Sequence, residues 1–383
     1  MIRFAVRRLL TGLIALLVFE FIIFFAVQLA FPGDYASTLK FQISAEELNQ
    51  LRQSLGLDQT LGHQYLIWVR SLVTGDPPLY RSMVVGVLVR FLPASLFAFG
   101  SAAVIAFFLG QRLGIAAAWR GPSLFSEGVS LLGILSYASF PPALVLLLSV
   151  ILGVRERTVA YPLDPTLPFW RTSAFSPETV LATMTAILAG LVLGVSGLGW
   201  AMRRIARVSL PPFIGILSVP SLLALASHFL GFGAQALAVL KAAVLPMLAY
   251  IMIGTGEVLV IMRASMENVI HEDYVQTARA KGLPDRQIRD RHAARSALLP
   301  VVSRMVVSLP YLMAGLVMVE AATGWPGMGN ALFSSVTSQF MPGVLAQFLV
   351  IGGFTLVARV GLDILLAYLD PRLRSPQAKR GLS

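Results

Sequence analysis

Two short motifs place a serine and a histidine in apolar surroundings, where they could carry out nucleophilic chemistry. Ser196 lies in a G-V-S-G motif and His228 in an H-F-L-G motif. A serine hydroxyl becomes a nucleophile when a histidine accepts its proton, which requires the two side chains to lie about 3 Å apart. The pair therefore raises the hypothesis of an intramembrane serine protease, which depends on where the surrounding helices place the two residues.

Three acidic residues lie within long apolar segments: Glu20, Glu257 and Asp363. Such residues carry protons or ions in carriers driven by an ion gradient, although they also pair with other buried groups. Other reactive groups are scarce. The chain has no cysteine, its four histidines show no metal-ligand spacing, and it contains no G-x-x-x-x-G-K-[ST] phosphate-binding loop. We therefore expect this chain to hold no metal ion or cofactor and to hydrolyse no ATP itself.

The composition around these residues is that of an integral membrane protein. Hydrophobic residues make up 56% of the 383 positions, charged residues only 13%, and the mean hydropathy is +0.77. Soluble domains carry about 25% charged residues. Apolar runs of about 20 residues, the length that crosses a bilayer, predict an all-α fold with about eight spanning helices. These helices are expected at residues 9–31, 92–119, 128–153, 179–200, 213–232, 237–262, 301–321 and 344–369.

Basic residues set the expected orientation in the membrane. If the N-terminus is cytoplasmic, 19 of the 30 Lys and Arg residues lie inside, including the densest cluster at 263–295. Because basic loops stay on the cytoplasmic side, we expect both termini, and with them the tail at 375–383, in the cytoplasm. The net charge of +11 follows from this asymmetry. It does not indicate nucleic-acid binding, because no basic surface is interleaved with aromatic residues.

This orientation argues against the serine protease. The helix at 179–200 runs inward and places Ser196 near its cytoplasmic end, whereas the helix at 213–232 runs outward and places His228 near its outer end. At 1.5 Å per residue, the two side chains are roughly 20 Å or more apart along the membrane normal. The small residues around Ser196 favour close helix packing instead.

The longest inward loop, at 263–299, carries the most informative pattern. Apolar residues at helical spacing predict an amphipathic helix at 265–281, with Gly282 as its C-terminal cap and Pro284 opening a second helix at 284–299. Two helices joined at a glycine would form a stiff protrusion. The small side chains of Ala278 and Ala280 would let a partner approach closely. A basic loop attracted to anionic lipid accounts for the pattern as well.

The same loop resembles the "EAA" loop in permease subunits of the dipeptide/oligopeptide/nickel family of ATP-binding-cassette (ABC) importers. The family's D-Y-v-x-T-A-R-A-K-G-L motif is matched by Asp273, Tyr274, Thr277, Ala278, Arg279, Ala280, Lys281, Gly282 and Leu283. Further family marks are P-G-D at 32–34, L-G-L-D at 55–58, Q-Y at 64–65, Glu320 with W-P-G-M-G at 325–329, Asp363, and D-P-R at 370–372.

The resemblance implies the type I ABC importer transmembrane fold in a bacterial or archaeal plasma (inner) membrane. It implies a second homologous permease subunit, two cytoplasmic ATPase subunits or domains that hold ATP and magnesium, and an extracytoplasmic substrate-binding protein. The cargo would be peptides or a similar small solute; a nickel chelate or a glycan is also compatible. The motif residues 273–283 would form the ATPase-coupling loop. The alternative, a secondary transporter driven by an ion gradient, needs no such protrusion.

The expected organisation departs from the family in one respect. The family has six spans, so residues 178–233 are interpreted as an inserted helical hairpin, expected on the outside of the bundle. The remainder divides into a first transmembrane helix at 1–31, an extracytoplasmic loop region at 32–90 and a permease core at 91–374, which includes the coupling loop at 263–300. Within the outer loop, a short helix is expected at 45–56, with Ser44 and Glu47 forming a capping box.

Overall fold

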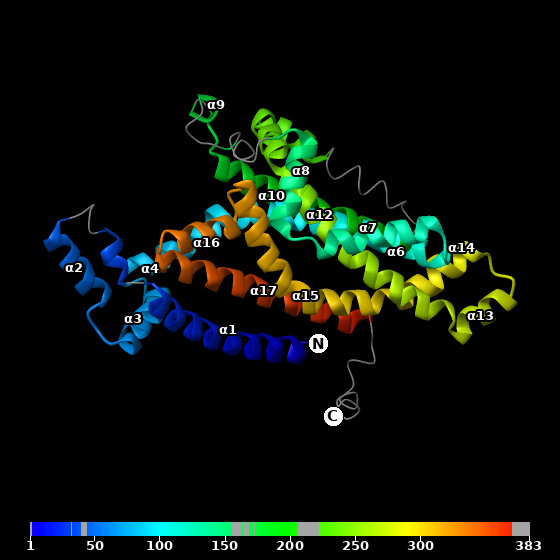
Figure 1. Cartoon of the computed structure of the whole chain (residues 1–383), viewed down its shortest axis with the longest axis horizontal. Helices are drawn as coiled ribbons and strands as arrows, with labels where there is room; N and C mark the ends of the chain where they lie inside the picture. Colours follow the sequence, from blue (N-terminus) through cyan, green and yellow to red (C-terminus); the bar gives the residue numbers. More distant parts are fainter. Residues whose placement is uncertain are drawn as a thin grey trace. The chain divides into compact units, whose positions relative to one another are not determined.

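The computed structural model describes residues 2–31, 33–39, 44–154, 163, 168–171, 173–205 and 222–369. Three predicted features lie wholly or largely outside these ranges: the tail at 375–383, the D-P-R mark at 370–372 and much of the helix at 213–232. Every secondary-structure element in the described part is a helix, which confirms the all-α prediction (Figure 1). The elements are α1 (Ile2–Ala30), η1 (Tyr35–Leu39), α2 (Ala45–Leu55), α3 (Leu61–Thr74), α4 (Pro78–Gly86), η2 (Val87–Phe91), α5 (Leu92–Ser95), η3 (Leu96–Gly100), α6 (Ser101–Trp119), α7 (Leu124–Ala138), α8 (Pro141–Leu152), α9 (Pro168–Arg171), α10 (Pro177–Ile205), α12 (Gly233–Ile270), α13 (Asp273–Ala280), α14 (Asp285–Gln287), η6 (Ile288–Ala293), α15 (Ala294–Thr323), α16 (Met328–Thr337) and α17 (Met341–Leu369).

Several helices have the length and composition to cross a membrane. Within the described part, four stretches qualify: Arg7–Ala30, Pro78–Trp119, Gly233–Ile270 and Met341–Ile364. The bent pair α7 and α8 would make a fifth if it forms one span. α10 and α15, of 29 and 30 residues, also lie where spans are predicted. The total of about eight spans stays a prediction.

The third span, expected at 128–153, is not one continuous helix. α7 and α8 meet at an angle of 116°. Ser139 and Phe140 have extended backbones, with ψ of 143° and 119°, and two prolines follow directly. A residue before proline is disfavoured in the helical region, so Pro141 and Pro142 explain the break.

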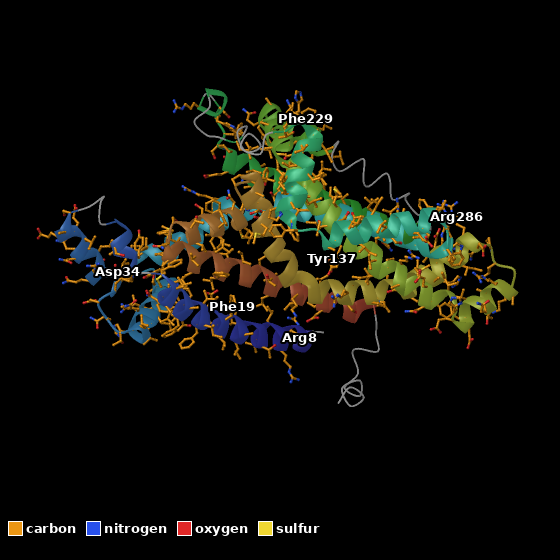
Figure 2. The ribbon with its side chains drawn as sticks, in the orientation of Figure 1. Arg8, Phe19, Asp34, Tyr137, Phe229 and Arg286 are labelled. Atoms are coloured by element: carbon orange, nitrogen blue, oxygen red, sulfur yellow. The ribbon has the colours of Figure 1, made fainter. Side chains whose placement is uncertain are left out.

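The chain divides into two compact units, of which the first contains Met1–Leu88, Ile261–Val317 and Ala331–Ser383. In this unit, α1 lies antiparallel along α17 (Figure 1). Arg8 contacts Asp363 at 3.4 Å near one end, and the rings of Phe19 and Phe348 are 6.0 Å apart further along; Arg8 and Phe19 are labelled in Figure 2. The other side of α1 is apolar and exposed, which suits contact with lipid.

The segment after α1 folds onto the end of this helix pair. Phe24, Trp68 and Leu345 belong to one buried apolar cluster that includes side chains from α1, α3 and α17. The capping box predicted for α2 is confirmed, because the Ser44 side chain accepts from the backbone N–H of Glu47 and the Glu47 side chain accepts from the backbone N–H of Ser44. These local signals define α2 independently of its surroundings.

The second unit contains Val89–Val260 and Met318–Asn330. Its helices α6, α7 and α12 pack backbone to backbone through glycine. A Cβ atom at Gly256 would lie 2.3 Å from the carbonyl oxygen of Gly133, and one at Gly110 would lie 2.7 Å from that of Thr255. Small residues permit such close helix contacts in membranes.

The first helix of the predicted hairpin is part of the packing of this unit. Val180, Leu181 and Met184 on α10 are buried, and the Thr185 hydroxyl donates to the carbonyl oxygen of Pro93 at 3.0 Å. One side of α10 therefore packs against protein, and the expectation that the hairpin lies on the outside of the bundle stays a prediction. Apolar composition alone could not distinguish a lipid-facing helix from one packed against protein.

Candidate functional site

The predicted coupling loop connects α12 to α15, and its first helix begins later than expected. α12 continues to Ile270, because Met262 and Met266 remain fully buried along it. The chain then turns at His271 and Glu272, and α13 begins at Asp273. The single amphipathic helix predicted at 265–281 is thus two helices with a break between them.

α13 has one buried side. Val275 is 0% exposed and Ala278 only 7%, whereas the other residues of this helix are exposed. Asp273, Thr277 and Ala280 are spaced four and three residues apart, so they share the face opposite the buried side. This exposed face presents a carboxylate, a hydroxyl and a methyl group in one row.

A glycine ends α13 as predicted. Gly282 has φ of +73°, a left-handed conformation that favours glycine. Its N–H donates to the carbonyl oxygen of Arg279 at 2.9 Å, and the N–H of Leu283 donates to that of Ala278 at 3.3 Å. Pro284 is extended and precedes α14, so it caps the second helix rather than forming its first turn. The result is a tight, hydrogen-bonded corner.

The buried side of α13 packs on the π-helical segment η6. Ile288 and Ala293 of this segment are both 0% exposed. On its outer side, Arg289 donates to Asp290 at 2.7 Å; this hydrogen bond raises the pKa of Arg289, which is charged in any case. Arg286 on α14, labelled in Figure 2, has an 89% exposed side chain. The loop is therefore anchored by apolar contacts and presents charge outward.

The structure brings the nine predicted motif residues together in α13 and the corner that follows it, with one correction. Ala278 was expected on the partner-facing surface, but it is turned inward, and Ala280 supplies the small exposed side chain instead. The sequence reasoning also missed Val275 and Ile288, which anchor the loop. Val275 and Ala278 are three residues apart, and this spacing of apolar residues is the signal that could have identified the inward face.

Five residues suggested a carrier or a protease, and the structure describes the surroundings of all but Ser196. Asp363 pairs with Arg8. Glu257 is buried in α12. Glu20 is buried in α1, and in the described part of the chain neither of its carboxylate oxygens has a hydrogen-bond partner. The Ser196 side chain lies outside the described residues, so its predicted separation from His228 stays a prediction.

Comparison with known proteins identifies the family. A family model described as "Binding-protein-dependent transport system inner membrane component" matches residues 182–375, and a model for the N-terminal region of such membrane components matches residues 1–83. The chain belongs to this family. The longer match includes most of 178–233, so the interpretation of that stretch as an insertion stays a prediction.

Similar proteins agree with this assignment over nearly their full length. A protein of Brucella suis biovar 1 (strain 1330) named as a peptide permease is 26% identical over 381 residues, which cover 98% of this chain and 99% of the relative. The glutathione transport system permease protein GsiC of Escherichia coli (strain K12) is 27% identical over 382 residues, with the same coverage of both chains.

Family membership decides between the functional classes. The chain is a multi-pass inner-membrane permease subunit of an ABC importer. It is the pore component rather than an enzyme, and ATP hydrolysis belongs to separate subunits. This assignment replaces the protease and the ion-driven carrier as explanations of the sequence.

Proposed function

We propose that residues 263–300 form the surface on which a cytoplasmic ATPase subunit docks and through which it drives transport. The observation that supports this proposal is the construction of α13. Val275 and Ala278 fix its inward side, so the outward row of Asp273, Thr277 and Ala280 is held in one orientation. A helix anchored in this way can transmit a displacement to the membrane helices, whereas a flexible basic loop on lipid could not.

The rest of the assembly follows from this role. Both termini and the loop face the cytoplasm, a second homologous permease completes the translocation path, and two ATPase subunits or domains carry ATP and magnesium. This chain carries no cofactor of its own. An extracytoplasmic binding protein delivers the substrate, for which peptides are the class favoured by the names of relatives. ATP-driven closure of the ATPase dimer would then switch the path between inward and outward access.

Substitution of Ala280 tests the docking surface. Ala280→Arg introduces a long charged side chain on the exposed row of α13 and removes no buried contact. We expect the subunit to assemble in the membrane at normal yield but to lose ATP-driven uptake in proteoliposomes. Ser54→Arg is the matched control, because Ser54 is exposed on α2 and lies outside residues 263–300. Equal uptake by both variants would contradict the docking role.

A further inference from the structure

A buried carboxylate in the second unit joins three segments that are far apart in the sequence. Glu320, on the last turn of α15, is 0% exposed. Its Oε2 accepts from the backbone N–H of Gly329 at 2.6 Å and from that of Asn330 at 3.3 Å, at the start of α16. Its Oε1 accepts from the Ser95 hydroxyl at 2.6 Å. The same hydroxyl accepts from the backbone N–H of Met328 at 2.8 Å, which closes the network.

The residues between Glu320 and α16 are shaped to fit this network. A Cβ atom at Gly327 would lie 2.2 Å from Glu320 Oε1, so a larger residue would displace the carboxylate from these hydrogen bonds. Trp325 is fully buried, and its indole N–H donates to the carbonyl oxygen of Ala94 at 3.0 Å. The W-P-G-M-G sequence therefore has a structural explanation. The tryptophan binds the turn to α5, and the two glycines let its backbone pack against the Glu320 carboxylate.

The position of this network in the chain gives it mechanical importance. α15 begins at Ala294, within the proposed docking loop, and is 30 residues long. Glu320 lies at the far end of that helix. α16 has only 10 residues, about 15 Å, which is half the hydrocarbon thickness of a bilayer. Ser95 lies between two π-helical segments, η2 and η3, a feature often found at functional sites.

We propose that Glu320 is a positioning residue that fixes the start of α16 to the end of α15 and to α5. A displacement of α15 during the ATPase cycle then carries α16 with it. This inference rests on the proposed docking function of residues 263–300. Without the carboxylate, the backbone N–H groups of Gly329 and Asn330 lose their acceptor, and α16 is free to lag behind α15.

The test follows α16 with a single cysteine, since the chain has none of its own. Ser334→Cys reports on the exposed side of α16, and Gln276→Cys reports on α13. Thiol reactivity is measured in the complex with its ATPase subunits in nanodiscs, without nucleotide and with a trapped ATP analogue. We expect Ser334→Cys reactivity to differ between the two states with Glu320 in place. In Glu320→Ala, the reactivity of Ser334→Cys should be the same in both nucleotide states. The nucleotide-dependent change in reactivity at Gln276→Cys and the ATPase rate should both be kept.

A second pair of variants guards against misfolding of Glu320→Ala. Ser95→Ala removes one donor to the carboxylate and should reduce the α16 response. Ser149→Ala is the matched control, because its buried hydroxyl donates only within α8, to the carbonyl oxygen of Leu146, and it should leave the response intact. A full nucleotide response at Ser334→Cys in an assembled Glu320→Ala or Ser95→Ala complex would overturn the positioning role. If the reactivity of Gln276→Cys does not change with nucleotide when Glu320 is present, the result contradicts the proposed docking function. The positioning role of Glu320, which rests on that function, is then contradicted as well.

Discussion

Replacement of Ile288 by alanine should loosen α13 while the membrane helices stay folded. Ile288 is 0% exposed and lies in η6, the segment on which α13 packs through Val275 and Ala278. The substitution removes three buried carbon atoms, worth about 0.8 kcal/mol each. With the cavity that remains, the loss is about 3 kcal/mol, within the range measured for such substitutions. Because about 1.4 kcal/mol changes an equilibrium tenfold, local opening of α13 should become on the order of 100-fold more frequent.

Hydrogen–deuterium exchange of the purified permease measures this opening directly. The amides of residues 273–280 should exchange much faster in Ile288→Ala, whereas those of α17 should be unchanged. Gln276→Ala is the control on the same helix; its side chain is exposed, so the effect should stay within about 0.5 kcal/mol. If residues 273–280 exchange at the same rate in Ile288→Ala as in the parent, η6 does not hold α13, and the rigid-protrusion argument is refuted.

Three further predictions concern other parts of the chain. Burial alone would raise the pKa of Asp34, but hydrogen bonds, led by that from Arg52, outweigh burial and lower the pKa below its usual value. The ion pair therefore contributes stability above the usual pKa of an aspartate, and this contribution is lost as the pH falls through the lowered pKa. Thermal unfolding at a series of acidic pH values should show this loss in the parent and not in Asp34→Asn. Gly256→Ala should lower the melting temperature of the solubilised protein strongly, because its Cβ would meet the carbonyl oxygen of Gly133, whereas Gly128→Ala, which meets no described atom within 4 Å, should have little effect. In intact cells, a cysteine at Gln287 should resist a membrane-impermeant thiol reagent and one at Ser54 should react; the reverse pattern would invalidate the proposed orientation.

Local signals were predicted from the sequence with good accuracy. α2 begins where Ser44 and Glu47 predict, because this end is defined by hydrogen bonds between near neighbours, and it ends at Leu55, one residue before the expected end. Gly282 ends α13 for the same reason. Apolar composition predicts a span at 128–153, whereas Pro141 and Pro142 restrict the backbone there and produce the bend between α7 and α8.

Features that depend on tertiary packing could not be predicted from local sequence signals. The break at His271 contains neither glycine nor proline, so the apolar periodicity continues across it and suggests one helix. What separates the two helices is burial of Met266 in the preceding helix and of Val275 in the following one. The inward side of α13 likewise follows from a contact with η6, a segment whose π-helical geometry has no simple sequence signature.

The proposed coupling motif at 273–283 would combine two physical roles that a sequence pattern cannot separate. Ala278 and Gly282 serve the fold of the loop itself, one by fitting against its anchor and the other by adopting a positive φ. Asp273, Thr277 and Ala280 are exposed. A residue that stabilises the loop should affect exchange and transport together, whereas a residue that meets the ATPase should affect transport alone. If the proposed docking role holds, recognition of the ATPase subunit is to be sought in the exposed row.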